Sequence, residues 1–206
     1  MPKEIILLRH GPKLKATGLS DLEVPAIDPT TCEDLTNLYK STESQIDLAK
    51  IALILHSDAP RTQQTAKYLY QLASLIDKYN EISKIEIPDS YKIVSNNLNL
   101  QNSLEQIYIQ IVKNGNSPCL NLFRSNIKAF EAIIAKGEKL KTDVLKLIRS
   151  LDFNKQTILI ISHEIVLQAI AYAFIKTDEI LNMSISELEG CKIDLENQKI
   201  YPITHT

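Results

Sequence analysis

Two arginines and two histidines of this 206-residue chain are of the types that bind and transfer phosphoryl groups: Arg9, His10, Arg61 and His163. Guanidinium groups bind phosphate oxygens in a bidentate way, and a neutral imidazole is nucleophilic near pH 7. Attack of an imidazole on phosphorus would give a phosphohistidine, while the arginines would neutralise the charge of the transition state. The leaving oxygen also needs a proton, so we expect a carboxylic acid or another donor nearby.

Three apolar runs are positioned to bring these residues together. The runs Ile5–Leu8, Ile51–Leu55 and Thr157–Ile161 are each typical of a strand buried on both faces of a parallel sheet. The polar residues that follow them are Arg9, His10 and Gly11 after the first run, Ser57 and Arg61 after the second, and His163 and Glu164 after the third. Ligands of open α/β sheets bind beyond the carboxyl ends of the strands. The sequence therefore predicts that these side chains converge on one anion-binding crevice.

The succession of buried strands and amphipathic helices predicts an α/β fold, a three-layer sandwich in which helices flank a mostly parallel sheet. The expected helices run from Thr31 or Asp34 to about Leu48, from near Pro60 to Ile76, from 127 to 135, from 138 to 151, and from about Ile165 to Phe174. Gly137 is interpreted as a stop or kink between two of them. A short strand is expected at 85–87, and a hairpin over Lys192–Leu195 and Lys199–Ile203.

The predicted organisation is one domain spanning residues 1–206 with an insertion at about 88–135. Residues 95–126 have the least regular pattern, including a Gly-Asn-Ser-Pro break at 115–118. We expect the insertion to form a helical cap over the site. Residues 12–31 contain several prolines and are predicted to form a long active-site loop.

Composition and charge narrow the classes of partner. A net charge of −2 and a pI near 6.1 give no broad basic surface, so no nucleic-acid partner is expected. No apolar run approaches the ~20 residues that span a bilayer, and no signal-peptide pattern is present, which predicts a cytoplasmic protein without membrane contacts. Cys32, Cys119 and Cys191 are odd in number and widely separated, so we expect free thiols and no disulfide or zinc site. No metal ion or cofactor is predicted, and the sequence leaves the oligomeric state open.

Three segments resemble a known family, in the order in which that family carries them. Leu7–Gly11 looks like the amino-terminal signature of the histidine phosphatase superfamily, which has the phosphoglycerate mutase-like fold. Ser57–Ala66 is similar to its serine-to-arginine-to-threonine-alanine segment, and Ile161–His163 looks like its second histidine. The resemblance implies metal-independent hydrolysis of a phosphomonoester or phosphoramidate. The substrate would be a small phosphorylated molecule or a phosphoprotein.

The resemblance also implies roles for individual residues. His10 would be the nucleophile that carries the phosphohistidine, Arg9 and Arg61 would hold the phosphoryl group, and His163 would stabilise it electrostatically. From the residues themselves, Gly11 is predicted to let the backbone turn away tightly or approach the substrate closely. Ser57 is predicted to contact the substrate, to cap the helix that follows, or to do both.

The sequence departs from the family pattern in two places. Relatives of the mutase type usually continue the first signature with glutamate and a hydroxyl residue, whereas Pro12–Lys15 follows here, which favours a phosphatase over a mutase. Many members carry a catalytic glutamate a short strand and loop after the second arginine, but Pro88–Asn102 contains only the carboxylate Asp89, with Glu86 just before it. We hypothesise that Glu164, beside the second histidine at a helix start, supplies the proton.

The proton donor is therefore Glu164, Asp89, Glu86 or no protein residue at all. An enzyme without an acid would favour substrates with good leaving groups, such as phosphoramidates. The missing glutamate also keeps a second function open, that of a catalytically weak or inactive member of the same fold that binds phosphate or phosphopeptides.

Overall fold

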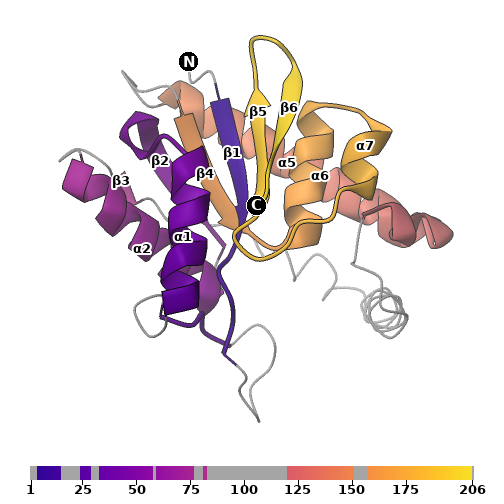
Figure 1. Cartoon of the computed structure of the whole chain (residues 1–206). Helices are drawn as coiled ribbons and strands as arrows, with labels where there is room; N and C mark the ends of the chain where they lie inside the picture. The colour runs from indigo at the N-terminus through magenta and orange to yellow at the C-terminus, as the bar shows by residue number, and fades with distance from the viewer. Residues whose placement is uncertain are drawn as a thin grey trace. The chain divides into compact units, whose positions relative to one another are not determined.

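The computed structural model describes residues 4–14, 24–28, 33–57, 59–76, 81–82, 120–150 and 157–205 (Figure 1). The chain forms two compact units. The sheet unit comprises Met1–Glu86, Leu151–Ser162 and Ser186–Thr206, and the helical unit comprises Ile87–Ser150 and His163–Ile185. Each unit is therefore assembled from segments that are far apart in the sequence.

A six-stranded mixed sheet is the framework of the sheet unit, with the strand order β3-β2-β4-β1-β5-β6. Its strands are β1 (Glu4–Arg9), β2 (Ile51–His56), β3 (Glu81–Ile82), β4 (Thr157–Ser162), β5 (Gly190–Asp194) and β6 (Lys199–Ile203). Strands β1 to β4 pair in parallel, whereas β5 pairs antiparallel with β1 and β6 antiparallel with β5. The mostly parallel sheet and the hairpin are thus confirmed. β3 is not among the predicted strands, and the strand expected at 85–87 lies outside the described residues.

The three central strands end level with one another. Between β1 and β4, Leu8 lies opposite Ile161 and Arg9 opposite Ser162, while His56 of β2 also lies opposite Ile161. Nearly every residue of these strands is buried, as expected for strands covered on both faces. The chain therefore leaves all three strands at the same edge of the sheet.

Two helices and a short 3-10 helix complete the described sheet unit. They are α1 (Glu33–Gln45), η2 (Leu48–Lys50) and α2 (Pro60–Ile76). Helix α1 ends before the predicted Leu48, whereas α2 has the predicted bounds and begins at Pro60, whose fixed φ suits a first helical turn. Tyr39 of α1 and Leu69 of α2 belong to one buried apolar cluster with residues of β1, β2 and β4. Both helices are thereby fixed to the central strands.

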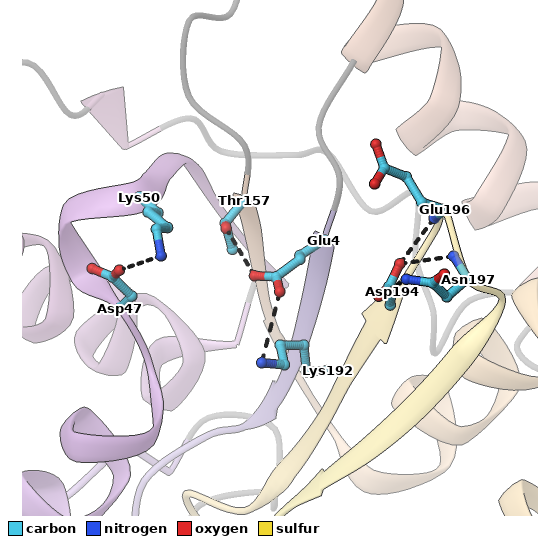
Figure 2. A network of polar contacts seen from close by, with 8 residues as sticks. All are labelled: Glu4, Asp47, Lys50, Thr157, Lys192, Asp194, Glu196 and Asn197. Carbon is cyan, nitrogen blue, oxygen red and sulfur yellow. Dashed lines mark hydrogen bonds and ion pairs between the residues drawn. The ribbon is translucent and has the colours of Figure 1, made fainter.

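Polar contacts join strands at the sheet end opposite to Arg9 (Figure 2). Glu4, the first residue of β1, accepts a hydrogen bond from Thr157 Oγ1 of β4 at 3.3 Å. Its other carboxylate oxygen lies 3.7 Å from Lys192 Nζ of β5. The ion pair thus connects β1 to the antiparallel hairpin, and the hydrogen bond connects it to β4.

The described part of the helical unit consists of η3 (Leu120–Ser125), α5 (Ile127–Ser150), α6 (Glu164–Phe174) and α7 (Asp178–Asn182). The predicted break at Gly137 is wrong, because α5 continues through this residue. A Cβ atom at Gly137 would lie 2.2 Å from the carbonyl oxygen of Ala169 on α6, so the glycine lets two helices approach closely. The predicted helix that ends at Phe174 is confirmed as α6, whereas α7 is too short to show a helical pattern in the sequence.

Some predictions fall partly outside the described residues. The structure does not describe 83–119, which hold much of the expected insertion, so the organisation as one domain with an insertion at about 88–135 stays a prediction. Cys191 is a buried free thiol, while Cys32 and Cys119 lie outside the described residues. Among the helices in the described ranges, none combines the length and apolar composition needed to cross a membrane.

Candidate functional site

The imidazole of His10 is fixed through both ring nitrogens. His10 follows β1 directly and is only 3% exposed. Its Nδ1 lies 2.7 Å from the carbonyl oxygen of Gly11, and its Nε2 lies 3.0 Å from Nε of Arg61. A carbonyl oxygen only accepts and a guanidinium Nε–H only donates, so Nδ1 carries the proton and Nε2 carries the lone pair. The contacts therefore assign one neutral tautomer.

The surroundings of His10 keep this ring neutral. Burial lowers the pKa of His10 to about 3, because a charged imidazolium would lose its hydration. The hydrogen bond to the Gly11 carbonyl acts in the opposite direction, and the positive charges of Arg61, Arg9 and Lys13 lower the pKa further. At neutral pH, His10 therefore presents an unprotonated Nε2 beside cationic side chains.

The two arginines reach this point from different elements. Arg61 lies in the first turn of α2, is 2% exposed, and contacts His10 although 51 positions separate them in the sequence. Arg9 is the last residue of β1, and its backbone N–H donates to Glu189 O at 2.8 Å. The sheet unit therefore contains Arg9, His10 and Arg61, three residues that the sequence analysis predicts to lie close together.

Gly11 is held by a threonine and a tyrosine to which the sequence analysis assigns no role. Its backbone N–H donates to Thr65 Oγ1 at 2.9 Å, and the same hydroxyl donates to the Arg61 carbonyl at 2.7 Å. A Cβ atom at Gly11 would lie 2.3 Å from the hydroxyl of Tyr39. The close approach that explains this glycine is thus to Tyr39.

Ser57 lies buried in the turn between β2 and α2. Its Oγ lies 2.8 Å from Oγ1 of Thr62, which is also 2.7 Å from the carbonyl oxygens of Ser57 and Ala59. Since Thr62 has one hydroxyl proton for the carbonyls, the Ser57 hydroxyl donates to Thr62. These contacts of Ser57 therefore stabilise the start of α2, and a contact with substrate stays a prediction.

The loop after His10 returns to α2. Ile27 N–H donates to Pro12 O at 2.7 Å, and Leu14 N–H donates to Pro25 O at 3.0 Å, so two parts of the predicted 12–31 loop pair in antiparallel fashion. Ala26 N–H donates to the side chain of Gln64 at 2.7 Å. Gln64, which has no role in the sequence analysis, thus attaches the loop to the helix that carries Arg61.

His163 and Glu164 belong to the helical unit. His163 directly follows β4 as the N-cap residue of α6, where its carbonyl accepts the Leu167 N–H at 3.0 Å. Glu164 is 5% exposed, and its Oε1 accepts the Ile185 N–H at 3.0 Å. This bond gives Glu164 a structural role, whether or not it also supplies a proton.

The other candidate acids, Asp89 and Glu86, lie outside the described residues. Within the described ranges, no three His, Cys, Asp or Glu side chains group together in a way that could hold a metal ion.

Comparisons with known proteins identify the fold. A scan against protein-family models gives no match, and a search of curated proteins gives none either. Solved structures match over the whole chain. A proposed α-ribazole-5′-P phosphatase from Escherichia coli is 13% identical with a TM-score of 0.58, covering 100% of this chain and 97% of that one.

Two further structures agree. A mycobacterial glucosyl-3-phosphoglycerate phosphatase is 13% identical with a TM-score of 0.55 and full coverage of both chains, at 100% each. A phosphoserine phosphatase from Entamoeba histolytica is 15% identical with a TM-score of 0.51, covering 98% of this chain and 95% of that one. At these identities the likeness shows the fold alone, which this chain shares with three phosphatases. The predicted α/β sandwich is confirmed.

Proposed function

We propose that this protein is a metal-independent phosphatase that acts through a phosphohistidine on His10. The observation that carries the proposal is the tautomer of His10, whose Nε2 lone pair faces the guanidinium group of Arg61 at 3.0 Å. A neutral nucleophilic nitrogen next to a group that binds phosphoryl oxygens is what attack on phosphorus requires.

The reaction has two steps. The oxygens of the phosphoryl group bind to Arg9 and Arg61, and His10 Nε2 forms a bond to phosphorus while the bond to the leaving oxygen breaks. The leaving group takes a proton from Glu164. Water then attacks the phosphohistidine, gives up a proton to the Glu164 carboxylate, and releases phosphate and neutral His10. His163 stabilises the negative charge of the phosphoryl group in both steps.

The hydrogen bond from Nδ1 to the Gly11 carbonyl supports this chemistry. The imidazole gains positive charge as the bond to phosphorus forms, and a carbonyl oxygen at 2.7 Å stabilises the Nδ1–H of a positively charged ring. The same contact holds the ring in one orientation, so that attack on phosphorus needs no rotation of the ring.

The fold likeness supports a small phosphorylated molecule as substrate. Phosphoproteins and phosphoramidates are the other substrates that the proposal includes. Structures of the mycobacterial neighbour contain VO3 or inorganic phosphate, and one structure of the Entamoeba neighbour contains 3-phosphoglyceric acid. Vanadate is therefore a suitable probe of the site in this chain.

The deciding experiment is hydrolysis of p-nitrophenyl phosphate, with and without a chelator, together with trapping of an acid-labile phosphoenzyme. We expect chelator-resistant turnover by the wild type and a loss of both signals, ~1,000-fold or more in turnover, in His10→Ala. His56→Ala is the matched control, since His56 is also buried, lies at the end of a strand, and bonds the carbonyl of the next residue at 2.9 Å. Absence of turnover and of trapping on a broad substrate panel would refute the proposal, and phosphate binding without turnover would identify a binding protein.

The role of Glu164 needs a separate test. Glu164→Gln should slow hydrolysis of an alkyl phosphate by roughly 100-fold or more but affect p-nitrophenyl phosphate much less, because only the poor leaving group needs the proton. Glu138→Gln, on the exposed side of the helical unit, is the control for the loss of a carboxylate. Near-full turnover of both substrates by Glu164→Gln would exclude Glu164 as the donor.

A further inference from the structure

Four hydrogen bonds form a closed ring around the proposed nucleophile. His10 Nδ1 donates to Gly11 O, Gly11 N–H donates to Thr65 Oγ1, Thr65 Oγ1 donates to Arg61 O, and Arg61 Nε donates back to His10 Nε2. All four distances lie between 2.7 and 3.0 Å. The end of β1 and the first turns of α2 are therefore joined twice, once through His10 and once through Thr65.

The hydroxyl of Thr65 donates and accepts at the same time. A threonine hydroxyl has one proton and two lone pairs. The proton goes to the Arg61 carbonyl and a lone pair accepts Gly11 N–H, while the side chain of Tyr39 also interacts with this hydroxyl. Thr65 is completely buried and Tyr39 is 1% exposed, so no water competes for these positions.

Tyr39 is neutral in this arrangement. Burial raises the pKa of Tyr39 to about 12, while its hydrogen bond with Thr65 acts in the opposite direction. The phenol is therefore protonated, and its ring is held edge-on to Tyr68 with centroids 4.6 Å apart. The Tyr39 hydroxyl also lies against Gly11. Tyr39 therefore limits movement of the same backbone that Thr65 binds.

We propose that Thr65 is a positioning residue that fixes the tautomer and orientation of His10. The inference rests on the proposed function for its catalytic consequence, but not for its structural content. Thr65 binds the backbone of Gly11, whose carbonyl selects Nδ1–H, and the backbone of Arg61, whose Nε–H selects the lone pair at Nε2. One hydroxyl thus sets the distance between the two groups that define the state of the ring.

The test replaces the hydroxyl without changing the shape of the side chain. In Thr65→Val, Gly11 N–H loses its acceptor, and we expect nitrogen NMR of the His10 ring to show a mixture of tautomers in place of one. We further expect kcat for p-nitrophenyl phosphate to fall roughly 10- to 100-fold, with a smaller change in KM. Thr65→Ser, which keeps the hydroxyl, should restore the single tautomer and most of kcat.

Thr157→Val is the control for a general loss of stability. Like Thr65→Val, it removes a buried threonine hydroxyl, in this case one that bonds Glu4 at the start of β4, at the end of the sheet opposite to His10. We expect Thr157→Val to have a lower melting temperature than the wild type but the same His10 tautomer and the same kcat. Because the tautomer is measured without substrate, it reports on the inference even if the chain does not hydrolyse phosphate esters.

A folded Thr65→Val protein with the single wild-type tautomer would overturn the inference. So would a loss of kcat that Thr157→Val reproduces at equal loss of stability. If Thr65→Val does not fold, Thr65→Ala takes its place, because it removes the same hydroxyl and leaves the Gly11 and His10 atoms intact. The inference then requires a detectable second tautomer in Thr65→Ala, and its absence would refute it.

Discussion

The burial of a neutral His10 predicts that this fold loses stability in acid through one identifiable residue. The pKa of His10 is about 3 in the folded chain, compared with 6.5 for an unperturbed histidine, and burial is the largest cause. Between these values the unfolded chain binds a proton at His10 that the folded chain does not bind. The free energy of unfolding therefore rises with pH across this window and is lost as the pH falls from 6.5 towards 3.

The size of the effect follows from the shift. One pKa unit corresponds to about 1.4 kcal/mol, so the full shift of His10 corresponds to roughly 5 kcal/mol, of which about 3 kcal/mol is lost by about pH 4.5. For a domain whose total stability is typically ~5–15 kcal/mol, this is a large fraction. Acid should therefore unfold the protein at a pH where His10 is still unprotonated in the native state.

Urea denaturation at about pH 7.5 and pH 4.5 measures this difference. We expect both proteins to lose stability between pH 7.5 and pH 4.5. The free energy of unfolding should fall by roughly 3 kcal/mol less in His10→Gln than in the wild type, because glutamine does not titrate. Thr42→Val is the control, since Thr42 Oγ1 bonds the carbonyls of Leu38 and Leu188, which do not titrate, and its removal should cost about 1 kcal/mol at both pH values. Equal pH dependence of the wild type and His10→Gln would refute the argument from burial.

Three further changes test the fold and the site. Gly190→Ala should destabilise the protein by several kcal/mol in thermal denaturation (~3 or more), because its Cβ would lie 1.8 Å from the carbonyl oxygen of Leu7 and force β5 away from β1. Gly137→Ala should also lower the melting temperature despite the better helix propensity of alanine, since its Cβ would lie 2.2 Å from Ala169 O; a rise in melting temperature would contradict the close packing of α5 and α6. Arg61→Lys should weaken inhibition by vanadate roughly tenfold or more, because lysine cannot bind phosphoryl oxygens in a bidentate way, and unchanged inhibition constants would exclude Arg61 from the anion site.

The contact between His10 and Arg61 could be predicted from the sequence because it depends on the geometry of the sheet. Apolar runs of four or five residues end next to both segments, and parallel strands bring such ends to one edge whatever their separation in the sequence. The register of β1, β2 and β4 produces this edge. Residue type then indicated the chemistry, since guanidinium and imidazole groups gathered at one edge of a sheet suit the binding of a phosphoryl group.

The residues that hold His10 in place could not be predicted from sheet geometry alone. Thr65 lies one helical turn after Arg61, so the two share a face of α2, but this spacing does not reveal that Gly11 N–H is the partner. Tyr39 comes from α1, whose amphipathic pattern is weak, and its approach to Gly11 depends on packing. Gly137 is ambiguous for the same reason, because a glycine that breaks a helix and a glycine that admits a neighbouring helix look alike in sequence.

The hydrogen bond between Arg61 and His10 has a consequence for how the proposed reaction begins. The Nε2 lone pair that must attack phosphorus is the one that accepts Arg61 Nε–H at 3.0 Å. Attack therefore requires this bond to break, and an arriving phosphoryl group offers the guanidinium an anionic acceptor in place of a neutral ring nitrogen, which makes the stronger pair. Binding of the anion would thus release the nucleophile at the moment when a phosphorus atom lies within its reach. In the absence of an anion the same bond stabilises a buried arginine next to a neutral ring, so the site can remain folded without substrate.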